Sequence, residues 1–397
     1  MEEFIIVMAA LFSAAVAGES LARFHIPRVV SQIMVGMILG TPMIHHLFTE
    51  QGLDAISLIA DLGIVLLMFF VGLEINFKAF VKNIKIASGI SLWNTTLPLA
   101  GGYLVSHYIF GMDPGVSFII GVCLSVSATA LALDMLEELN MFKSRIANMI
   151  ASSGTVDDIY ELILITVSIS LIEAVAIQSE LIALVQNATL FVLFILLSRP
   201  LVRWTLNYVQ KNKESALVMV GLIIPFMFAS VSNYLGFSPL IGALISGIMV
   251  RHALVIETIP HRPWAAHHIS RHIHSIAFGF LVPIFFVHVG IQTDITAIWK
   301  NINFGIIITA IAITGTVVGT AIGYYISTRL WKEGILLGWA LNSKGDTELV
   351  IASMALNAGI INPDIYSSLI FMAVVSTLVS PFIFRHLLRR VYITRFK

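Results

Sequence analysis

Three acidic side chains lie close together in a segment that is otherwise apolar. Asp157 and Asp158 are adjacent in "ASSGTVDDIYELILI" (151–165), and Glu161 follows about one helical turn later. A carboxylate buried away from water favours its neutral, protonated form unless a cation compensates its charge. Two adjacent carboxylates repel each other and titrate as a coupled pair. The pattern therefore predicts a site that holds either a proton or a metal cation, so that the two compete.

Oxygen ligands for such a cation are present nearby in the sequence. Carboxylate, hydroxyl and backbone carbonyl oxygens suit Na+ or K+. We identify Asp158 as the candidate metal ligand, with Asp157, Thr129, Ser153 and Thr155 as further candidates for binding the cation or the proton.

A buried ion pair that only fixes packing is the alternative interpretation of these carboxylates. Lys344 and His288 are the basic partners that the apolar segments offer. Three carboxylates against one or two bases leave an excess of acid, which favours a binding site. Glu161 lies four residues after Asp157 and so on the same helix face. Two roles remain open for Glu161, namely pairing with Lys344 or a place on the proton path.

The composition indicates an all-α polytopic membrane protein. The 397 residues are 58% hydrophobic and 12% charged, whereas a soluble domain has roughly twice that charged fraction. Mean hydropathy is +0.92. The single cysteine, Cys123, excludes a disulfide framework. Zero net charge without a separate basic block predicts no nucleic-acid partner.

Thirteen apolar runs are long enough to cross ~30 Å of hydrocarbon as helices. They cover 3–19, 27–44, 55–76, 86–107, 115–134, 146–172, 180–199, 215–233, 237–251, 274–291, 303–327, 333–357 and 364–386.

The distribution of basic residues supports this count and predicts an orientation. Of the 23 Lys and Arg residues, all but Lys300 and Lys344 lie in the segments that follow odd-numbered runs or within two residues of the run ends that border those segments. Cytoplasmic loops of membrane proteins carry the excess of Lys and Arg. We therefore expect a multi-pass protein of the cell membrane with its N-terminus outside and its C-terminus in the cytoplasm.

Three pairs of similar segments indicate an internal repeat. "QIMVGMIL" (32–39) resembles "ALISGIMV" (243–250), "VGLEIN" (71–76) resembles "VGIQTD" (289–294), and "SVSATALAL" (125–133) resembles "SKGDTELVI" (343–351). The offsets are nearly constant, and each pair is separated by seven crossings, an odd number. The sequence thus predicts two inverted six-helix repeats, as secondary transporters have, at 1–178 and 214–397, joined by a connecting span within 179–213.

Spans 5 and 12 carry polar residues near mid-membrane and are predicted to be broken, crossed helices. Span 5 contains Ser125 and Ser127, and span 12 contains "SKGDTE" with Lys344, Asp346 and Glu348. Each predicted break lies about 15 Å from the start of its span. Unwound backbone is tolerated in a membrane only where it lines a cavity or is buried in protein. Asp346 suits a positive helix end and Lys344 a negative one; the alternative for the serines is back-bonding to their own helices.

Several of these motifs together resemble the monovalent cation:proton antiporters that include the Kef, Nap and Ger exchangers. They are "TVDDIYELILI", "LIGALISGIMV", "LMFFVGLEIN", "VPIFFVHVGI" and "NSKGDTELV". The resemblance covers all thirteen spans. It implies a homodimer in which a core domain, spans 3–6 and 10–13, moves against a dimerisation domain as an elevator. It also implies that Asp158 is the cation and proton ligand, that Asp157 is auxiliary, and that no cofactor is needed.

Two departures from the family pattern matter. Electrogenic sodium exchangers of this type carry a lysine in span 11, whereas this chain has Thr316 (or Thr314) there, which predicts electroneutral exchange. Kef proteins continue into a cytoplasmic nucleotide-binding domain, whereas this sequence ends at Lys397. We expect either a protein without that domain or a C-terminal regulatory domain missing from this sequence.

A histidine-rich loop follows the ninth span. The segment 251–274 holds six histidines, among them His268 and His272 at a spacing of four residues. Histidine titrates near neutral pH and this spacing also suits a metal, but an interfacial helix with solvated histidines is the favoured interpretation.

The expected function is a secondary Na+/H+ antiporter, with K+/H+ exchange as the alternative. A sodium-coupled solute symporter would need a further polar pocket, and the sequence shows none. A channel would keep its flux without Asp158. An enzyme is not expected, because the segment with Asp157 and Asp158 has no histidine at helical spacing and no nucleophile motif is present.

Overall fold

The computed structural model describes most of the chain and is built of helices. The described residues are 2–23, 26–45, 48–74, 84–127, 132, 136, 144–176, 181–210, 214–235, 239–253, 271–345 and 347–392, and none of them forms a strand. Contacts divide the chain into two compact units. Unit 1 comprises 1–15, 46–75 and 173–288, and unit 2 comprises 16–45, 76–172 and 289–397. These units are discontinuous in the sequence, so their boundaries differ from those of the predicted repeats at 1–178 and 214–397. The inverted repeat stays a prediction.

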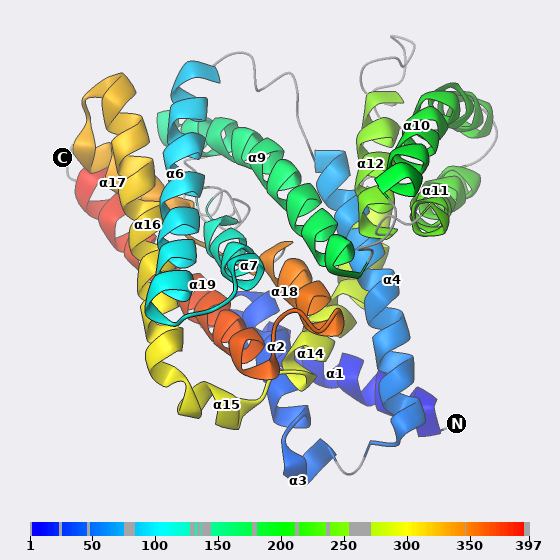
Figure 1. Ribbon diagram of the computed structural model, residues 1–397, viewed down its shortest axis with the longest axis horizontal. Coiled ribbons are helices and arrows are strands. Elements are labelled where there is room, and N and C mark those ends of the chain that lie inside the picture. The colour runs from blue at the N-terminus through cyan, green and yellow to red at the C-terminus, as the bar shows by residue number, and fades with distance from the viewer. Residues whose placement is uncertain are drawn as a thin grey trace. The chain divides into compact units, whose positions relative to one another are not determined.

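Unit 1 is built around α4 (Glu50–Glu74), which packs against α12 (Pro239–Arg251). A Cβ on Gly72 would overlap the Leu244 carbonyl, and one on Gly247 would overlap that of Phe69, so both positions need glycine for this close approach. The unit also contains α10 (Leu181–Gln210) and α11 (Glu214–Tyr234), drawn in green in Figure 1. Phe69, Phe228 and Ile273 belong to its buried core.

Unit 2 contains the elements that bear the predicted site. α6 (Ile84–Leu104), extended by the π-helix η1 (Val105–Ile109), runs beside α16 (Ile302–Thr328) in Figure 1. Glycines on α16 let the backbones meet, because a Cβ on Gly319 would overlap the Trp93 carbonyl and one on Gly323 that of Gly89. Small residues allow such close packing of helices in a membrane. This contact places Asn94 of α6 against α16.

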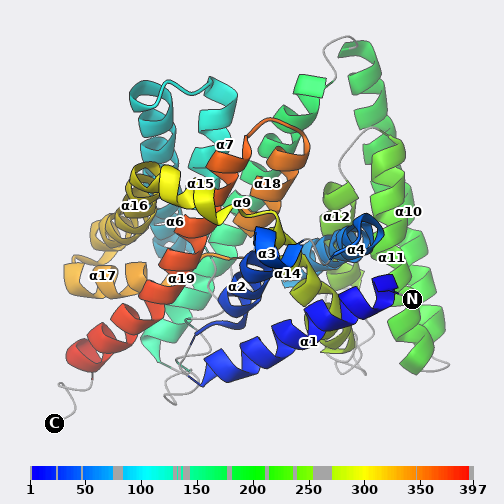
Figure 2. The same ribbon diagram turned by 90° about the horizontal axis from the view of Figure 1, so that it is seen from below.

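The remaining helices of unit 2 surround that pair. They are α2 (Arg28–Leu39), α3 (Pro42–His45), α7 (Pro114–Ser125), α9 (Arg145–Ala176, with its last four residues in unit 1), α15 (Ile295–Lys300), α17 (Trp331–Ala340), α18 (Thr347–Asn357) and α19 (Pro363–Tyr392). Figure 1 and Figure 2 both show α7 and α18 side by side, and their residues are in contact. Ile150, Leu337 and Phe384 belong to a buried core that joins α9, α17 and α19. α1 (Glu2–Ala22) and α14 (Val282–Ile291, preceded by η3, Ala277–Leu281) each contribute residues to both units.

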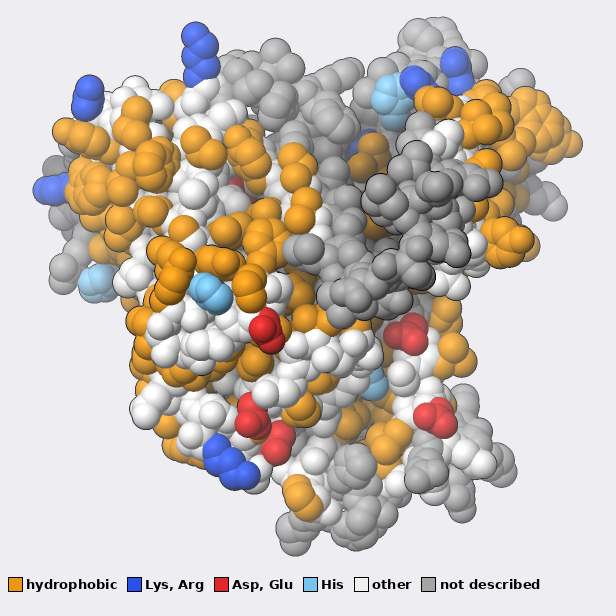
Figure 3. Space-filling view, viewed as in Figure 1, with side chains coloured by type: hydrophobic (Ala, Val, Ile, Leu, Met, Phe, Trp, Pro, Cys, Tyr) orange, Lys and Arg blue, Asp and Glu red, His pale blue; other side chains and the backbone are white. Residues whose placement is uncertain are grey.

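Charged side chains mark the two ends of the α6–α16 pair. Lys85 lies in the first turn of α6, and Arg329 and Lys332 follow α16. Because the two helices are antiparallel, these exposed basic residues share one end. Exposed Asp113 and Asp294 lie at the other end, next to Lys300. In the part of Figure 3 that corresponds to α6 and α16 in Figure 1, blue Lys and Arg atoms lie at the upper end, and red Asp and Glu atoms lie lower down together with one blue side chain.

Each of the thirteen predicted apolar runs contains described helix, although several boundaries differ. Four helices in the described part, at 51–70, 271–291, 302–328 and 363–388, are long and apolar enough to cross a membrane by length and composition. The helix α10 extends beyond the predicted apolar run 180–199, through Pro200 and Arg203 to Gln210. Hydropathy marks the end of the apolar stretch, whereas helical hydrogen bonding continues beyond it. The number of crossings stays a prediction.

Candidate cation and proton site

Asp157 is a fully buried carboxylate on α9 whose geometry is set by α6 and α16. Its side chain is 1% exposed. Asn94 Nδ2 of α6 donates a hydrogen bond of 3.2 Å to Asp157 Oδ2. The Thr320 hydroxyl of α16 donates in turn to Asn94 Oδ1 at 3.3 Å. Because Thr320 takes the oxygen of the amide, the NH2 group of Asn94 faces the carboxylate.

The second oxygen of this carboxylate is available for a ligand. Asp157 Oδ1 is buried and has no hydrogen-bond partner among the side chains and backbone that the structure describes. The hydroxyl groups of Ser91 and Ser127 lie near the carboxylate. Ser127 Oγ is also buried and without a partner in the described part of unit 2. Buried acceptors are nearly always satisfied in native proteins, so these two atoms are suited to a bound proton or cation.

The serines nearest the acidic pair mostly bond to helices. Ser153 is fully buried and its hydroxyl donates to the Met149 carbonyl at 2.8 Å. The Ser91 hydroxyl donates to the Ser153 carbonyl at 3.2 Å, which ties α6 to α9 one turn before Asp157. The Ser125 hydroxyl donates to the Val122 carbonyl at 2.8 Å. The back-bonding alternative thus describes the hydroxyl of Ser125 but not that of Ser127, which bonds to none of the described residues.

The helix α7 ends next to two buried charged side chains. Its last residue is Ser125, and Val126 is extended with φ −62° and ψ 141°. Lys344 Nζ donates to the Val126 carbonyl. The Ser127 N–H donates to Glu161 Oε1 at 2.7 Å. Lys344 is 1% exposed and Glu161 is 7% exposed, so both side chains are removed from solvent within unit 2.

The chain that carries Lys344 is interrupted between α17 and α18 and is held by α19. Gly345 has φ +144°, a conformation that L side chains rarely adopt. The Lys344 N–H donates to Thr377 Oγ1 at 3.0 Å, and the Thr377 hydroxyl donates back to the Lys344 carbonyl. Asn342 Nδ2 donates to Ser380 Oγ at 2.8 Å. The two bonds with Thr377 satisfy backbone groups of Lys344 that the interruption leaves without helical partners.

The other predicted site residues divide into described and undescribed ones. Glu348 is buried in the first turn of α18 and interacts electrostatically with Lys344. Thr316 is buried on α16, one turn before Thr320, and its hydroxyl has no partner within the described residues. Thr129 and Asp346 lie outside the described residues, as do 254–270 of the histidine-rich loop. Asp158 and Thr155 belong to α9, but their side chains are outside what the structure describes.

Sequence reasoning missed three residues around Asp157, namely Ser91, Asn94 and Thr320. The signal that could have found Asn94 is "WNTT" (93–96) within an apolar run, because a buried amide in a membrane needs a polar partner. Thr320 offers no comparable signal, since a threonine can satisfy its hydroxyl on its own helix.

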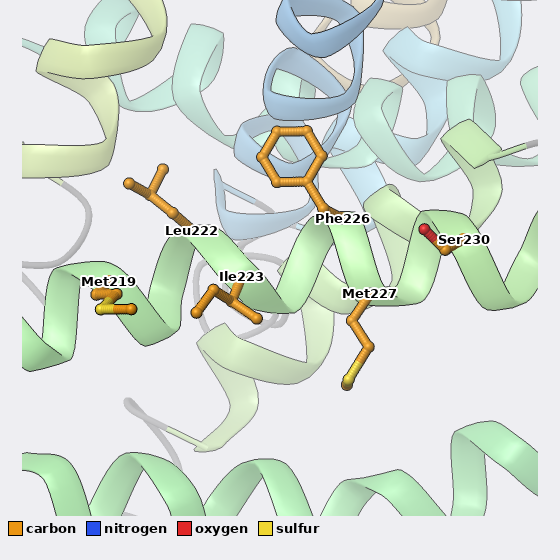
Figure 4. Close-up of a pocket in the computed structure, with 6 residues that line it drawn as sticks. All are labelled: Met219, Leu222, Ile223, Phe226, Met227 and Ser230. Atoms are coloured by element: carbon orange, nitrogen blue, oxygen red, sulfur yellow. The ribbon is translucent and has the colours of Figure 1, made fainter.

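A groove along α11 in unit 1 shows that apolar hollows are also present. It has a volume of about 410 Å³ and is lined by Met219, Leu222, Ile223, Phe226, Met227 and Ser230 (Figure 4). Five of its lining side chains are apolar and the sixth carries only a hydroxyl, so the groove has no group that would recognise a charged solute. The groove therefore does not support a symporter.

Fold and site together define a multi-pass, α-helical membrane protein with an ionisable cluster buried in its interior. The chain belongs to the sodium/hydrogen exchanger family: the family model described as "Sodium/hydrogen exchanger, transmembrane" matches residues 7–390. This confirms the resemblance to monovalent cation:proton antiporters.

Similar curated proteins extend over nearly the whole chain. A Na+/H+ antiporter of Enterococcus hirae is 26% identical over 98% of this chain and 99% of its own length. The Na+/H+-K+ antiporter GerN of Bacillus cereus is 25% identical over 96% and 95%. A K+/H+ antiporter of Saccharomyces cerevisiae is 27% identical over 89% of this chain and 42% of its own length.

A solved structure has the same fold. The sodium proton antiporter MjNhaP1 from Methanocaldococcus jannaschii at pH 8 superimposes with a TM-score of 0.61 at 14% identity, covering 96% of each chain. At this identity the likeness concerns the fold alone.

Proposed function

We propose that this protein is a secondary active Na+/H+ antiporter in which Na+ and H+ compete for the buried aspartates. The observation that carries the proposal is the buried oxygen of Asp157 that has no hydrogen-bond partner among the described residues. Membership of the exchanger family and the names of the similar proteins from Enterococcus and Bacillus support it.

The competition follows from the chemistry of the carboxylates. A buried aspartate is stable when a proton neutralises it or when a cation compensates its charge. Asn94 favours the ionised form of Asp157 by donating to it. Asp158 is the proposed direct ligand, with Asp157, Thr129, Ser153 and Thr155 around it. A cation then leaves on the side where protons are abundant, and protons leave where the cation is abundant.

The interrupted helices give the site its place in the proposed transport cycle. The end of α7 at Ser125 and the interruption between α17 and α18 are joined by the contact from Lys344 to Val126. This contact supports the proposal of crossed, broken helices in two inverted six-helix repeats with thirteen spans. Such repeats allow one half to rock or slide against the other around a fixed site. We extend the proposal to a homodimer of the cell membrane that works as an elevator.

Proteoliposomes with a pH-sensitive dye inside test this function directly. Adding Na+ outside should move protons out of a vesicle that carries an imposed acidic interior, without any organic solute. Absence of cation-dependent proton flux from well-folded protein would contradict the proposal. Flux that requires an organic solute would show a symporter.

K+/H+ exchange is the second candidate function. It is favoured by the names of the yeast and Bacillus relatives, which include K+. Comparing Na+, Li+ and K+ in the same vesicles decides between them, because the antiporter responds to the ion that its site accepts.

A further inference from the structure

One peptide group beside the site is held at both ends by side chains of opposite charge. Val126 and Ser127 share this peptide, whose carbonyl accepts from Lys344 Nζ and whose N–H donates to Glu161 Oε1 at 2.7 Å. We call the arrangement the peptide clamp. It lies directly after the last residue of α7, Ser125, where the chain has left helical geometry.

The peptide clamp joins three separate segments of unit 2. Glu161 comes from α9, Lys344 from the interruption between α17 and α18, and the peptide from the end of α7. Lys344 is itself anchored through its backbone to Thr377 of α19. All of these side chains are buried. The orientation of one short stretch of backbone therefore depends on groups far apart in the sequence.

The bonds of the clamp are of the strong kind. A hydrogen bond to a charged group is shorter and roughly twice as strong as one between neutral groups. A peptide between an ammonium and a carboxylate is polarised in the sense that strengthens both bonds. The clamp also satisfies a backbone N–H and a carbonyl that the end of α7 leaves outside the helix.

The clamp acts on the site through Ser127. Holding the Ser127 N–H positions its Cα and thereby restricts the positions that its hydroxyl can take. This hydroxyl lies near the Asp157 carboxylate and has no partner within the described residues. Movement of this peptide would therefore move an oxygen near the Asp157 carboxylate.

We propose that Glu161 and Lys344 are positioning residues that set the cation affinity of the site by holding the Val126–Ser127 peptide. On this proposal Glu161 carries no transported proton. The inference rests on the proposed antiport function and assigns a role within that same site.

The test uses the full chain in proteoliposomes and measures two quantities, the half-saturating Na+ concentration and the maximal rate. Glu161→Gln keeps an oxygen for the Ser127 N–H, and Lys344→Arg keeps a donor for Val126. Glu161→Leu and Lys344→Met remove the bonds. Glu333→Gln is the matched control. Glu333 of α17 accepts a hydrogen bond of 2.8 Å from the Tyr324 hydroxyl of α16 and lies outside the clamp.

We expect the conservative variants to exchange with a half-saturating concentration within about threefold of the wild type. The Leu and Met variants should raise it by about tenfold or more, because each loses a hydrogen bond to a charged group; tenfold corresponds to about 1.4 kcal/mol. The double variant Glu161→Leu/Lys344→Met should resemble either single variant, because each loss releases the same peptide. Glu333→Gln should leave the half-saturating concentration unchanged.

Three results would overturn the clamp. Complete loss of exchange in Glu161→Gln would show that Glu161 carries the proton. Strictly additive effects in the double variant would show independent roles. A reduced maximal rate at unchanged half-saturation would show a merely structural role.

The conservative pair decides the matter if the Leu and Met variants do not reach the membrane. Exchange retained in both Glu161→Gln and Lys344→Arg, each with its cation affinity near wild type, supports the clamp, and exchange lost in either opposes it. Absence of exchange in the wild type itself would instead refute the proposed function.

Discussion

At the scale of single residues, the central feature is the asymmetry of Asp157: Asn94 hydrogen-bonds one carboxylate oxygen, and the other has no partner in the described part of the chain. A carboxylate with both oxygens satisfied would be a structural group. One open oxygen in a buried position gives a proton or a cation a place to bind. Asp158 follows it directly on α9 and is the proposed ligand.

The two aspartates should differ in their response to neutralisation. Asp158→Asn should abolish exchange, because the direct ligand for cation and proton is gone. Asp157→Asn should weaken exchange more mildly, since the amide still fits beside Asn94 but holds no proton. Dye-based flux in proteoliposomes measures both. Equal effects would point to a shared role, and retained activity in Asp158→Asn would refute the assignment.

Asn94 should tune the competition between proton and cation. Replacing it with Leu removes a donor that favours the ionised carboxylate, so the proton is held more firmly and Na+ competes less well. We expect the half-saturating Na+ concentration to rise by about tenfold, as losing a bond to a charged group would cause, and to rise most at low pH. Thr95→Val is the control, since Thr95 is a buried neighbour on the same helix. An unchanged affinity in Asn94→Leu would remove Asn94 from the site.

Glycine positions decide how closely elements approach one another, and this places the polar residues. Gly319 and Gly323 of α16 meet the backbone of α6 around Trp93 and Gly89. The approach brings Thr320 within hydrogen-bond distance of Asn94. The polar chain from Thr320 to Asp157 therefore exists because two helices pack without side chains between them.

Gly319→Val should separate these helices. Its side chain would overlap the Trp93 carbonyl, which is backbone and cannot rotate away. Overpacking of this kind costs about 1–3 kcal/mol, and exchange should fall with it because Asn94 shifts. Thermal unfolding in detergent measures the loss. Gly115→Ala is the control, since a Cβ there meets no atom within 4 Å; equal melting temperatures for both variants would contradict the argument.

The short helix α15 carries a pH-dependent cap at its start. Asp294 accepts from the Thr296 N–H at 2.7 Å and from the Thr296 hydroxyl at 2.6 Å. These hydrogen bonds from Thr296 lower the pKa of Asp294 below its usual value. A lowered pKa means that the stabilisation is present at neutral pH and is lost as pH falls through the folded pKa.

Asp294→Asn tests this cap because asparagine also caps helices but does not titrate in this range. The melting temperature of the wild type should exceed that of the variant near neutral pH. This difference in melting temperature should shrink as the pH falls below the pKa of free aspartate, about 3.9. A difference that stays constant across this range would show that the charge of Asp294 does not matter.

At the scale of the whole molecule, the balance of charge in the interior decides whether transport moves net charge. Thr316 is proposed to stand where electrogenic relatives carry a lysine, so no second basic group from α16 would exchange its proton in the cycle. We therefore expect electroneutral exchange. Collapsing the membrane potential with valinomycin and K+ should leave Na+-driven proton flux unchanged. A clear dependence on potential would overturn this expectation.

The sequence predicted the helical class and the family well, because both depend on composition and on local motifs. Apolar length defines a membrane helix, and "SKGDTE" cannot continue one without polar partners. The end of α10 was not predicted, because its helical hydrogen bonding continues to Gln210 beyond the apolar run. It also missed Asn94 and Thr320, since nothing local in either segment indicates its partner.

The sequence by itself determined that this is an α-helical membrane protein, because long apolar runs cross a membrane as helices. It also determined that acidic residues lie among these apolar ones and need a partner or a function, because burial of charge in lipid is costly. Only the tertiary structure decided which partners meet: Asn94 with Asp157, and Glu161 with Lys344 across a single peptide. These contacts join residues more than thirty positions apart, and no periodicity encodes them. They arise from the close packing of helices, which depends on shape and is settled when the chain folds.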